Sequence, residues 1–158
     1  MKEIYIIRHG ETDLNKLGIV QGRGIDSDLN DKGRAQGAAF FYRYKEVKFD
    51  KIYTSNLKRT HQTVKGFIDL GLPWQKLAGL DELAWGLWEG QKSSLKSRAA
   101  FREMMEKWQS GNYDAKFEGG ESPIEVQFRL QEAMQIILSH TKEKRILICM
   151  HGRAMRLL

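Results

Sequence analysis

The sequence predicts an α/β protein with a mainly parallel sheet between two layers of helices. Two short runs rich in apolar residues, Ile4–Ile7 and Arg145–Met150, have the composition of strands that are covered on both faces, as the strands of parallel sheets are. Amphipathic helical segments alternate with the predicted strands, and this alternation favours a parallel sheet. The chain has 158 residues, the size of one domain, so we expect residues 1–158 to form a single domain.

The first half of the chain contains two predicted strand–helix pairs. Each strand is short and rich in β-branched and aromatic residues, and each helix follows a residue whose side chain can cap its first N–H groups. The expected elements are a strand at Ile4–Ile7, a helix from Asp31 to about Val47 capped by Asn30, a strand at Phe49–Thr54, and a helix capped by Ser55 that reaches about Leu70 and is ended by Gly71 and Pro73.

The second half is predicted to hold two strands and two helices. Ser122-Pro123-Ile124-Glu125 is a capping box with proline at the first helical position, which marks a helix start. Apolar side chains recur after it at helical spacing, as far as Leu138. The other expected elements are a short strand at Leu77–Leu80, an amphipathic helix at Gln91–Trp108 and the strand at Arg145–Met150.

The composition argues against several classes of protein. The net charge is +6, but no run of five or more lysines and arginines occurs, so the basic residues do not form the stripe that many nucleic-acid binders carry. No stretch approaches the length of a membrane span. The one cysteine, Cys149, rules out an internal disulfide and a cysteine-based metal cluster, and it fits a reducing compartment. We therefore expect a cytoplasmic protein without a nucleic-acid or membrane partner.

Two histidines occupy equivalent places, each directly after a predicted strand and directly before a glycine. These pairs are His9-Gly10 and His151-Gly152. The carboxyl ends of parallel strands meet at one edge of the sheet, where ligands bind in such folds. Glycine lets the backbone approach a ligand and offer its N–H to an anion. A single histidine is more often structural, but this pair, with Arg8 beside it, favours a functional site.

A further basic residue, Arg59, is expected near the same edge of the sheet. It lies in the first turns of the helix that follows the second predicted strand. A planar guanidinium matches the geometry of phosphate oxygens. His61 and His140 lie within helical stretches, and we expect both to be non-catalytic.

Five segments of the chain, taken in order, resemble the histidine phosphatase superfamily, also called the phosphoglycerate mutase-like family. They are IDSDLNDKGRAQG, SNLKRTHQTV, DELAWGLWEG, GGES and MHG, and they come after the opening motif RHGET, which is followed by Asn15 and by Gln21-Gly22. A motif as short as RHGE occurs by chance, whereas several segments in the family's order are specific. The resemblance runs from Ile4 to Leu158, essentially the whole chain.

The resemblance implies the three-layer α/β/α fold of that family and a phosphatase that needs neither a metal nor another cofactor. In the family, the imidazole of the first motif, here His9, attacks phosphorus and forms a phosphohistidine that water hydrolyses. The other roles follow by motif: Arg8, Arg59 and His151 hold the phosphate with help from Asn15 and Gly152, Gln21 and Gly22 contact the substrate, and Glu82 gives the leaving group its proton. The spacing to Gly86 favours Glu82 over Asp81, Glu89 and Glu11, and we expect Trp85 and Trp88 to form an apolar wall beside it.

The expected function is hydrolysis of a small phosphorylated metabolite through a phosphohistidine. The tryptophan-glutamate-glycine ending of the Glu82 segment is similar to that of the small phosphatases, including broad-specificity and α-ribazole-phosphate enzymes. Two alternatives stay open. One is phosphoglycerate mutase-type phosphoryl transfer, and the other is a non-catalytic protein that binds phosphate or a partner.

The chain departs from the family pattern in two respects. Arg153 stands directly after His-Gly, where a small residue is frequent, and Leu14 stands where tryptophan is common, so both concern substrate fit. Relatives also continue, past the point that corresponds to Leu158, with a helix and strands that this C-terminally short chain lacks. The strand at Ile4–Ile7 is then an exposed edge, which either pairs with another chain, as in a homodimer, or is covered by the rest of a longer product.

Overall fold

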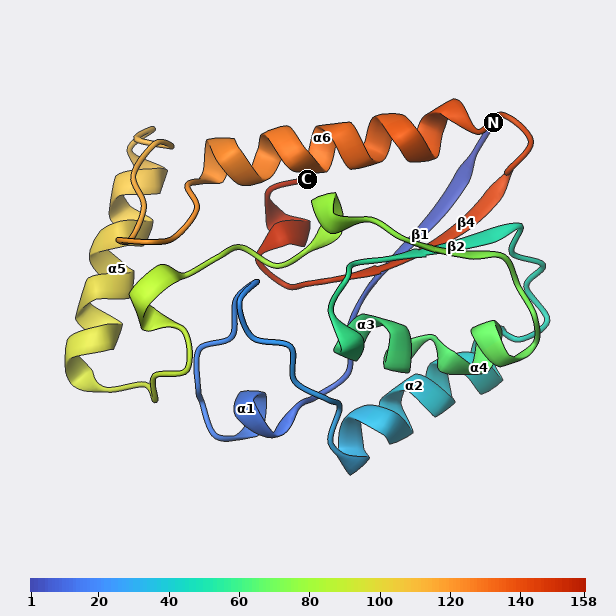
Figure 1. The fold of residues 1–158 in the computed structure, drawn as a ribbon, viewed down its shortest axis with the longest axis horizontal. Coiled ribbons are helices and arrows are strands. Elements are labelled where there is room, and N and C mark those ends of the chain that lie inside the picture. Colours follow the sequence, from blue (N-terminus) through green and yellow to red (C-terminus); the bar gives the residue numbers. More distant parts are fainter.

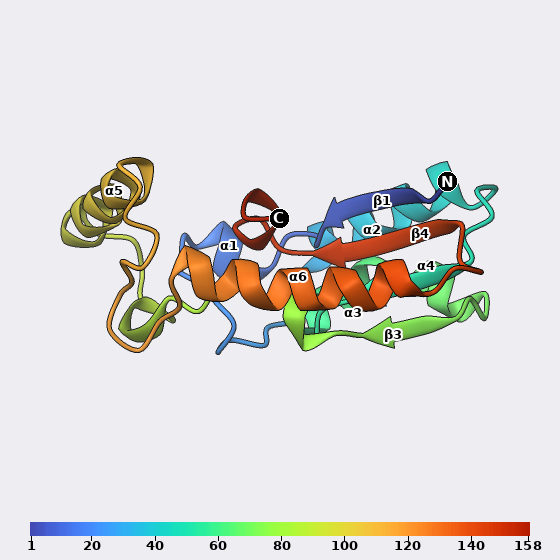
Figure 2. The same ribbon diagram turned by 90° about the horizontal axis from the view of Figure 1, so that it is seen from above.

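The computed structural model describes all residues from Met1 to Leu158. Its centre is a four-stranded parallel sheet with the strand order β1-β4-β2-β3; Figure 1 labels β1, β4 and β2, and Figure 2 labels β3. The strands are β1 (Glu3–Arg8), β2 (Lys51–Thr54), β3 (Trp74–Lys76) and β4 (Arg145–Met150). The last strand in sequence, β4, lies between β1 and β2, so segments from the two ends of the chain meet in the sheet.

Helices cover both faces of the sheet (Figures 1 and 2). One face carries α6 (Pro123–Ser139), and the other carries α2 (Asp31–Tyr44), α3 (Lys58–Thr63) and α4 (Lys65–Asp69). Two further helices lie beyond the carboxyl ends of the strands: α1 (Asp13–Lys16) and α5 (Leu95–Gln109), which begins later than predicted because Ser94 is its N-cap. The predicted three-layer α/β fold is confirmed.

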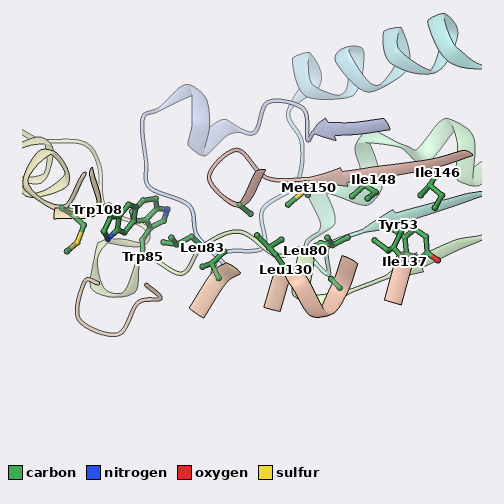
Figure 3. Close-up of a cluster of buried hydrophobic side chains, with 14 residues drawn as sticks. Tyr53, Leu80, Leu83, Trp85, Trp108, Leu130, Ile137, Ile146, Ile148 and Met150 are labelled. Atoms are coloured by element: carbon green, nitrogen blue, oxygen red, sulfur yellow. The ribbon is translucent and has the colours of Figure 1, made fainter. Parts of the chain in front are cut away.

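Successive residues of β4 point to opposite faces of the sheet, and both faces are covered. Ile146, Ile148 and Met150 belong to the larger apolar cluster, which lies under α6 (Figure 3). Leu147 and Cys149 belong to a smaller cluster under α2 and α4. All five side chains are fully buried, so the continuous apolar run in the sequence reflects a strand at the centre of three layers.

Two predicted helix starts are confirmed in detail. At the start of α2, the side chain of Asn30 accepts a hydrogen bond from the N–H of Gly33 at 2.9 Å. At the start of α6, Ser122 accepts from the N–H of Glu125 at 3.3 Å, and the Glu125 carboxylate accepts from the N–H of Ser122 at 2.7 Å. This reciprocal pair is the capping box that the sequence predicts.

The helix after β2 differs from the prediction at its start and in its middle. It begins at Lys58 instead of directly after Ser55, and it is interrupted at Val64, which separates α3 from α4. Ser55 does not cap it. The Ser55 hydroxyl accepts the N–H of Leu57 at 3.1 Å and meets a ring nitrogen of His151 at 2.8 Å, and its contacts with α3 are made to the side chains of Thr60 and His61.

The third strand also lies elsewhere than predicted. The strand is Trp74–Lys76, and the predicted segment Leu77–Leu80 forms a 3₁₀ turn at Ala78–Leu80 instead. The Leu77 N–H donates to the carbonyl of Thr54, the last residue of β2, at 2.8 Å, and the pairing with β2 stops there. The apolar residues that suggested a strand therefore reach the core from a turn.

The outer strand β1 pairs with β4 alone and forms one edge of the sheet, as expected for Ile4–Ile7. Its interior side chains are half-buried. Ile4 and Ile6 pack against the α6-side cluster, and Tyr5 and Ile7 pack against the other one. None of the helices combines the length and the hydrophobicity that a membrane span requires.

Candidate active site

Three polar side chains follow three neighbouring strands at the point where each strand ends. His9 follows β1, Ser55 follows β2 and His151 follows β4. The N–H of His9 donates to the carbonyl of Met150 at 3.1 Å, which aligns the two strand ends. The imidazole rings of His9 and His151 lie with their centroids 5.1 Å apart. The structure thus brings the two predicted histidines together at the carboxyl edge of the sheet.

The His9 ring is oriented with one nitrogen free. Its Nδ1 lies 2.7 Å from the carbonyl oxygen of Gly10, and because a carbonyl only accepts, Nδ1 carries the proton and donates. The other nitrogen, Nε2, therefore keeps its lone pair. Burial lowers the pKa of His9 to about 3 and the charges of Arg59 and Arg8 add to this, although the bond to Gly10 acts in the opposite direction. His9 is a neutral imidazole at neutral pH.

The second histidine is fully buried, and one of its nitrogens has no partner. His151 Nε2 lies 2.8 Å from the Ser55 hydroxyl oxygen, whereas Nδ1 makes no hydrogen bond. Burial lowers the pKa of His151 well below its ordinary value, and the charge of Arg59 lowers it further. This ring is also neutral.

Arg59 is the largest fully buried side chain of the protein, with an exposed fraction of 1%. Its Nη1 donates to the carbonyl of Ile25 at 2.6 Å and its Nη2 to the carbonyl of Gly22 at 3.3 Å. Burial lowers the pKa of Arg59, and the nearby carboxylate of Glu82 raises it. Carbonyls of the loop after α1 thus hold the guanidinium in place without neutralising it by direct pairing.

Two buried side-chain nitrogens in the whole chain lack a hydrogen-bond partner: Arg59 Nε and His151 Nδ1. An unpaired buried polar group costs free energy, and native proteins rarely leave one. Both nitrogens belong to residues that the sequence assigns to the phosphate. An anion bound between them would supply the missing acceptors.

A cavity of about 300 Å³ opens next to His9 and is lined only by polar residues and glycine. Its lining residues are Arg8, His9, Gly10, Glu11, Asn15 and Gln36. The Arg8 side chain is exposed and lies against Gly152, where a Cβ would stand 3.2 Å from Arg8 Nε. The structure therefore brings the predicted residues Arg8, Asn15 and Gly152 to the His9 site.

Of the predicted substrate-binding residues, only Arg8 and Asn15 line this cavity; the other five are Gln21, Gly22, Arg59, His151 and Gly152. The Gln21 side chain donates to Thr12 Oγ1 at 2.6 Å, and the Gly22 carbonyl holds Arg59. Gly22 is buried against the carbonyl of Leu83, so a side chain would not fit there. Both residues hold other site residues in place: Gln21 contacts Thr12, which pairs with Asn15, and Gly22 accepts a hydrogen bond from Arg59.

The Glu82 carboxylate is buried at the same end of the sheet, with an exposed fraction of 8%. Its two oxygens accept backbone N–H groups of Leu83 at 2.9 Å, of Arg153 at 3.1 Å and of Ala154 at 2.9 Å. Two of these donors directly follow His151-Gly152, so the carboxylate is tied to the second histidine motif. The three rival carboxylates have other partners: Asn30 and Lys32 for Glu11, Arg23 for Asp81, and the N–H of Trp85 for Glu89.

Trp85 and Trp88 were predicted to form an apolar wall beside Glu82, and their observed ring contacts are with other aromatic side chains. The ring centroid of Trp85 lies 4.9 Å from that of Phe101 and 6.1 Å from that of Trp108, and the ring centroid of Trp88 lies 5.9 Å from that of Phe101. These rings form an aromatic cluster against α5. The contacts that position Glu82 are backbone N–H groups instead.

Sequence reasoning missed two polar residues that support the histidines. Ser55 contacts His151, and the Thr63 hydroxyl accepts the N–H of Gly10 at 2.9 Å. Ser55 follows β2 directly, as His9 follows β1, so its position in the sequence could have predicted that it lies at the same edge of the sheet. Thr63 lies four residues after Arg59 on α3, the spacing of one helical turn. No three His, Cys, Asp or Glu side chains come together in an arrangement that could hold a metal ion.

Comparison with known families and curated proteins gives matches along the chain. A family model described as "Histidine phosphatase superfamily (branch 1)" matches residues 4–158. "Probable phosphoglycerate mutase GpmB" of Erwinia tasmaniensis is 32% identical over 160 residues, which cover 100% of this chain and 73% of that protein. "Fructose-2,6-bisphosphatase TIGAR" of Bos taurus is 48% identical over 64 residues, which are 40% of this chain and 24% of that protein.

Solved structures share the fold. The structure of Bacillus stearothermophilus YhfR superposes with a TM-score of 0.86 at 30% identity, covering 100% of this chain and 78% of that one. The α-ribazole phosphatase from Shigella flexneri superposes with a TM-score of 0.82 at 24% identity, covering 96% of this chain and 75% of that one. The second likeness shows the fold alone.

Proposed function

Since this chain belongs to the histidine phosphatase superfamily, we propose that it is a phosphomonoester hydrolase that passes the phosphoryl group through Nε2 of His9 to water. The observation that carries the proposal is the pair of unpartnered buried nitrogens, Arg59 Nε and His151 Nδ1, beside a neutral imidazole. A cationic site with free donors is complementary to the charge of a transferring phosphoryl group.

In the first step, the Nε2 lone pair of His9 forms a bond to phosphorus while the bond from phosphorus to the ester oxygen breaks. Glu82 gives its proton to that oxygen, and the alcohol leaves. In the second step, Glu82 takes a proton from water, the water oxygen attacks phosphorus, and the bond from phosphorus to nitrogen breaks. Inorganic phosphate is released, and His9 and Glu82 return to their starting states.

The basic residues stabilise the non-bridging oxygens in both steps. Arg59 and Arg8 supply guanidinium N–H groups, and His151 donates from Nδ1 when that nitrogen carries the proton. The resting His9 stays unprotonated because burial and these same positive charges lower its pKa. The same cations therefore keep His9 unprotonated and stabilise the phosphate oxygens. We propose that no metal ion takes part.

The substrate class is a small phosphorylated metabolite. The segments that match the fructose-2,6-bisphosphatase relatives make up between 24% and 32% of those proteins, so their substrate is one candidate among others. A broad range of esters and α-ribazole phosphate are the other candidates that the sequence resemblance suggests. We also propose a cytoplasmic location, because the single cysteine requires no oxidising compartment.

The proposal is tested by hydrolysis of p-nitrophenyl phosphate in the presence of EDTA. We expect turnover in the wild type, none in His9→Ala, and normal turnover in the control His140→Ala, whose exposed ring bonds only to its own helix. Stopping the reaction early should trap an acid-labile phosphoenzyme that His9→Ala cannot form.

Two results would replace the proposal with its alternatives. Transfer of phosphate between hydroxyl groups of phosphoglycerate, without release to water, would indicate a mutase. Binding of inorganic phosphate without turnover of any ester would indicate a non-catalytic phosphate-binding protein.

A further inference from the structure

A second cavity, of about 360 Å³, carries two guanidinium groups that have no acidic partner. Its lining includes Gln21, Trp85, Ser93, Arg98 and Arg153, and no aspartate or glutamate is among its lining residues. The side chains of Arg98 and Arg153 form neither a hydrogen bond nor an ion pair within the protein. Arg23, Arg34, Arg129 and Arg145 pair with carboxylates, whereas Arg8, Arg43, Arg102 and Arg156 do not. Arg98 and Arg153 differ from these unpaired arginines in that both line one cavity.

The cavity is linked by hydrogen bonds to two parts of the proposed active site. The backbone N–H of Arg153 donates to Glu82, the residue proposed to protonate the leaving oxygen, at 3.1 Å. Gln21, another lining residue, donates to Thr12, which in turn pairs with Asn15 of the phosphate cavity. The cavity is therefore joined to the Glu82 carboxylate through the backbone of Arg153, and to the phosphate cavity through Gln21 and Thr12.

The Arg153 side chain is held in a defined position. Its guanidinium carbon lies over the rings of Trp85 and Trp108, at 5.6 and 5.8 Å from their centroids, and these two tryptophans lie side by side at the end of the apolar cluster (Figure 3). Ring faces attract the cation but accept none of the N–H bonds in its plane. The donors of a half-buried and pre-positioned guanidinium thus remain available to a ligand.

The charge balance of the cavity favours an anionic ligand. Burial lowers the pKa of Arg153, the positive charge of Arg156 lowers it further, and the more distant Glu82 compensates only in part. A bound anion removes this penalty. Arg98, which is exposed in the first turn of α5, adds a second positive charge to the same cavity.

We propose that the cavity formed by Arg98 and Arg153 binds a second anionic group, a carboxylate or another phosphate, on the alcohol part of the substrate. The proposal rests on the proposed phosphatase function and narrows its substrate class to phosphomonoesters with a second negative charge. Arg153 is the main specificity-determining residue, and Arg98 assists it. A planar guanidinium is well suited to either group because it can donate two parallel N–H bonds.

The test uses matched pairs of substrates that differ in the second charge. One pair is glycerol 3-phosphate and 3-phosphoglycerate, which carries a carboxylate. The other is glucose 6-phosphate and glucose 1,6-bisphosphate. We expect kcat/KM of the wild type to favour the doubly anionic member of at least one pair by about tenfold, the size expected for one charge-assisted contact. The pair that shows the larger ratio identifies the anion.

Three variants separate the proposed role from a structural one. Arg153→Gln and Arg98→Gln should reduce the preference, Arg153→Gln more strongly, because they lower kcat/KM for the charged member more than for its partner. Arg102→Gln, one turn further along α5 and outside the cavity, should leave the ratio unchanged. A wild type that does not discriminate within either pair, or an Arg153→Gln variant that loses the same factor on both members, overturns the proposal.

Binding measurements keep this result distinct from failure of the phosphatase function. If the wild type releases phosphate from no ester, the proposed function fails, and calorimetric titration with 3-phosphoglycerate and glycerol 3-phosphate then decides the second site. Tighter binding of 3-phosphoglycerate that is lost in Arg153→Gln supports the anion site. Equal binding of the two compounds, or a preference that Arg153→Gln retains, rejects it.

Discussion

Glu82 is buried and is held by three backbone N–H groups, two of them from the segment after His151. This placement ties the carboxyl group to the segment that directly follows His151-Gly152. A proton donor matters most when the leaving alcohol is a poor leaving group. The loss of rate when Glu82 cannot donate a proton should therefore depend on the leaving alcohol of the substrate.

Glu82→Gln should slow hydrolysis of glycerol 3-phosphate by about 100-fold or more, the lower range for general acid catalysis. It should slow hydrolysis of p-nitrophenyl phosphate far less, because p-nitrophenolate leaves without protonation. The measurement is kcat for both esters in wild type and variant. Equal losses on the two esters would argue against Glu82 as the acid.

The two buried imidazoles should make the folded protein sensitive to mild acid. The pKa values of His9, about 3, and of His151 are below those of the unfolded chain, which are about 6.5. Below that pH the unfolded state binds more protons than the folded state, so the free energy of unfolding falls as the pH is lowered. Each histidine contributes up to about 1.4 kcal/mol per pH unit, and neither contributes above about pH 7.

Urea denaturation at pH 7, 6 and 5 measures this slope. We expect the double variant His9→Asn/His151→Asn to lose the part of the slope that these two rings contribute, while His140→Ala keeps it. His61, whose pKa is also lowered by burial, contributes to the slope that remains. The measurements stop at pH 5 because carboxylates whose pKa is lowered by folding, such as Glu11 and Asp50, add their own slope at more acidic pH. An unchanged slope in the double variant would show that other groups cause the acid sensitivity.

At the scale of elements, one arginine of α6 ties the Glu82 segment to the helix. Arg129 donates to the carbonyls of Gly79, Asp81 and Glu82 at 2.8 to 3.0 Å, and it forms a two-bond ion pair with Glu121 at 2.9 Å. The 3₁₀ turn before Glu82 has no strand partner of its own. This guanidinium therefore adds to the contacts that hold the turn, which include the buried Leu80 and the bond from the N–H of Asn56 to Asp81.

Arg129→Met should lower the free energy of unfolding by about 3 kcal/mol, since it leaves buried acceptors without donors. It should also lower kcat on glycerol 3-phosphate more than on p-nitrophenyl phosphate, because Glu82 loses its support. Urea denaturation and kinetics on both esters measure the two effects. The control is Lys107→Gln, which removes only a surface pair with Glu103 and should cost less than about 1 kcal/mol. A stable Arg129→Met variant with unchanged kinetics would contradict this role.

At the scale of the whole molecule, the open edge of β1 is the main unpartnered backbone surface. Glu3 and His9 donate their N–H groups toward β4, so by alternation the N–H groups of Ile4, Ile6 and Arg8 point to the open side. Such an edge is a template for pairing with another strand. A homodimer through β1 remains a prediction.

Size-exclusion chromatography with light scattering, over a range of concentrations, tests the dimer. In a dimer paired through β1, the amides of Ile4 and Ile6 should also exchange with deuterium more slowly than expected for an open edge. The buried amide of Ile148 in the central strand β4 serves as the slow reference. A monomer with rapidly exchanging Ile4 and Ile6 amides would contradict the prediction.

Several parts of this molecule follow from sequence alone because the responsible interactions are local. The capping box at Ser122, the cap at Asn30 and the apolar run of β4 each depend on neighbouring residues, and each lies where predicted. The histidines after β1 and β4 were predictable as a pair, because parallel strands place their carboxyl ends at one edge. The shift of the third strand and the late start of α3 were not predictable, because both depend on contacts between segments.

The sequence by itself determined the α/β layering and the order of the elements, and its resemblance to the family is the basis for proposing His9, Arg8, Arg59, His151 and Glu82 as site residues. Only the tertiary structure decided how they are held: Arg59 by the carbonyls of Ile25 and Gly22, His151 by Ser55, and Glu82 by the N–H groups of Arg153 and Ala154. It alone joined Arg98 and Arg153 in one cavity. The physical reason is that periodicity and capping act within a few residues, whereas burial and unpaired donors arise where distant segments pack together.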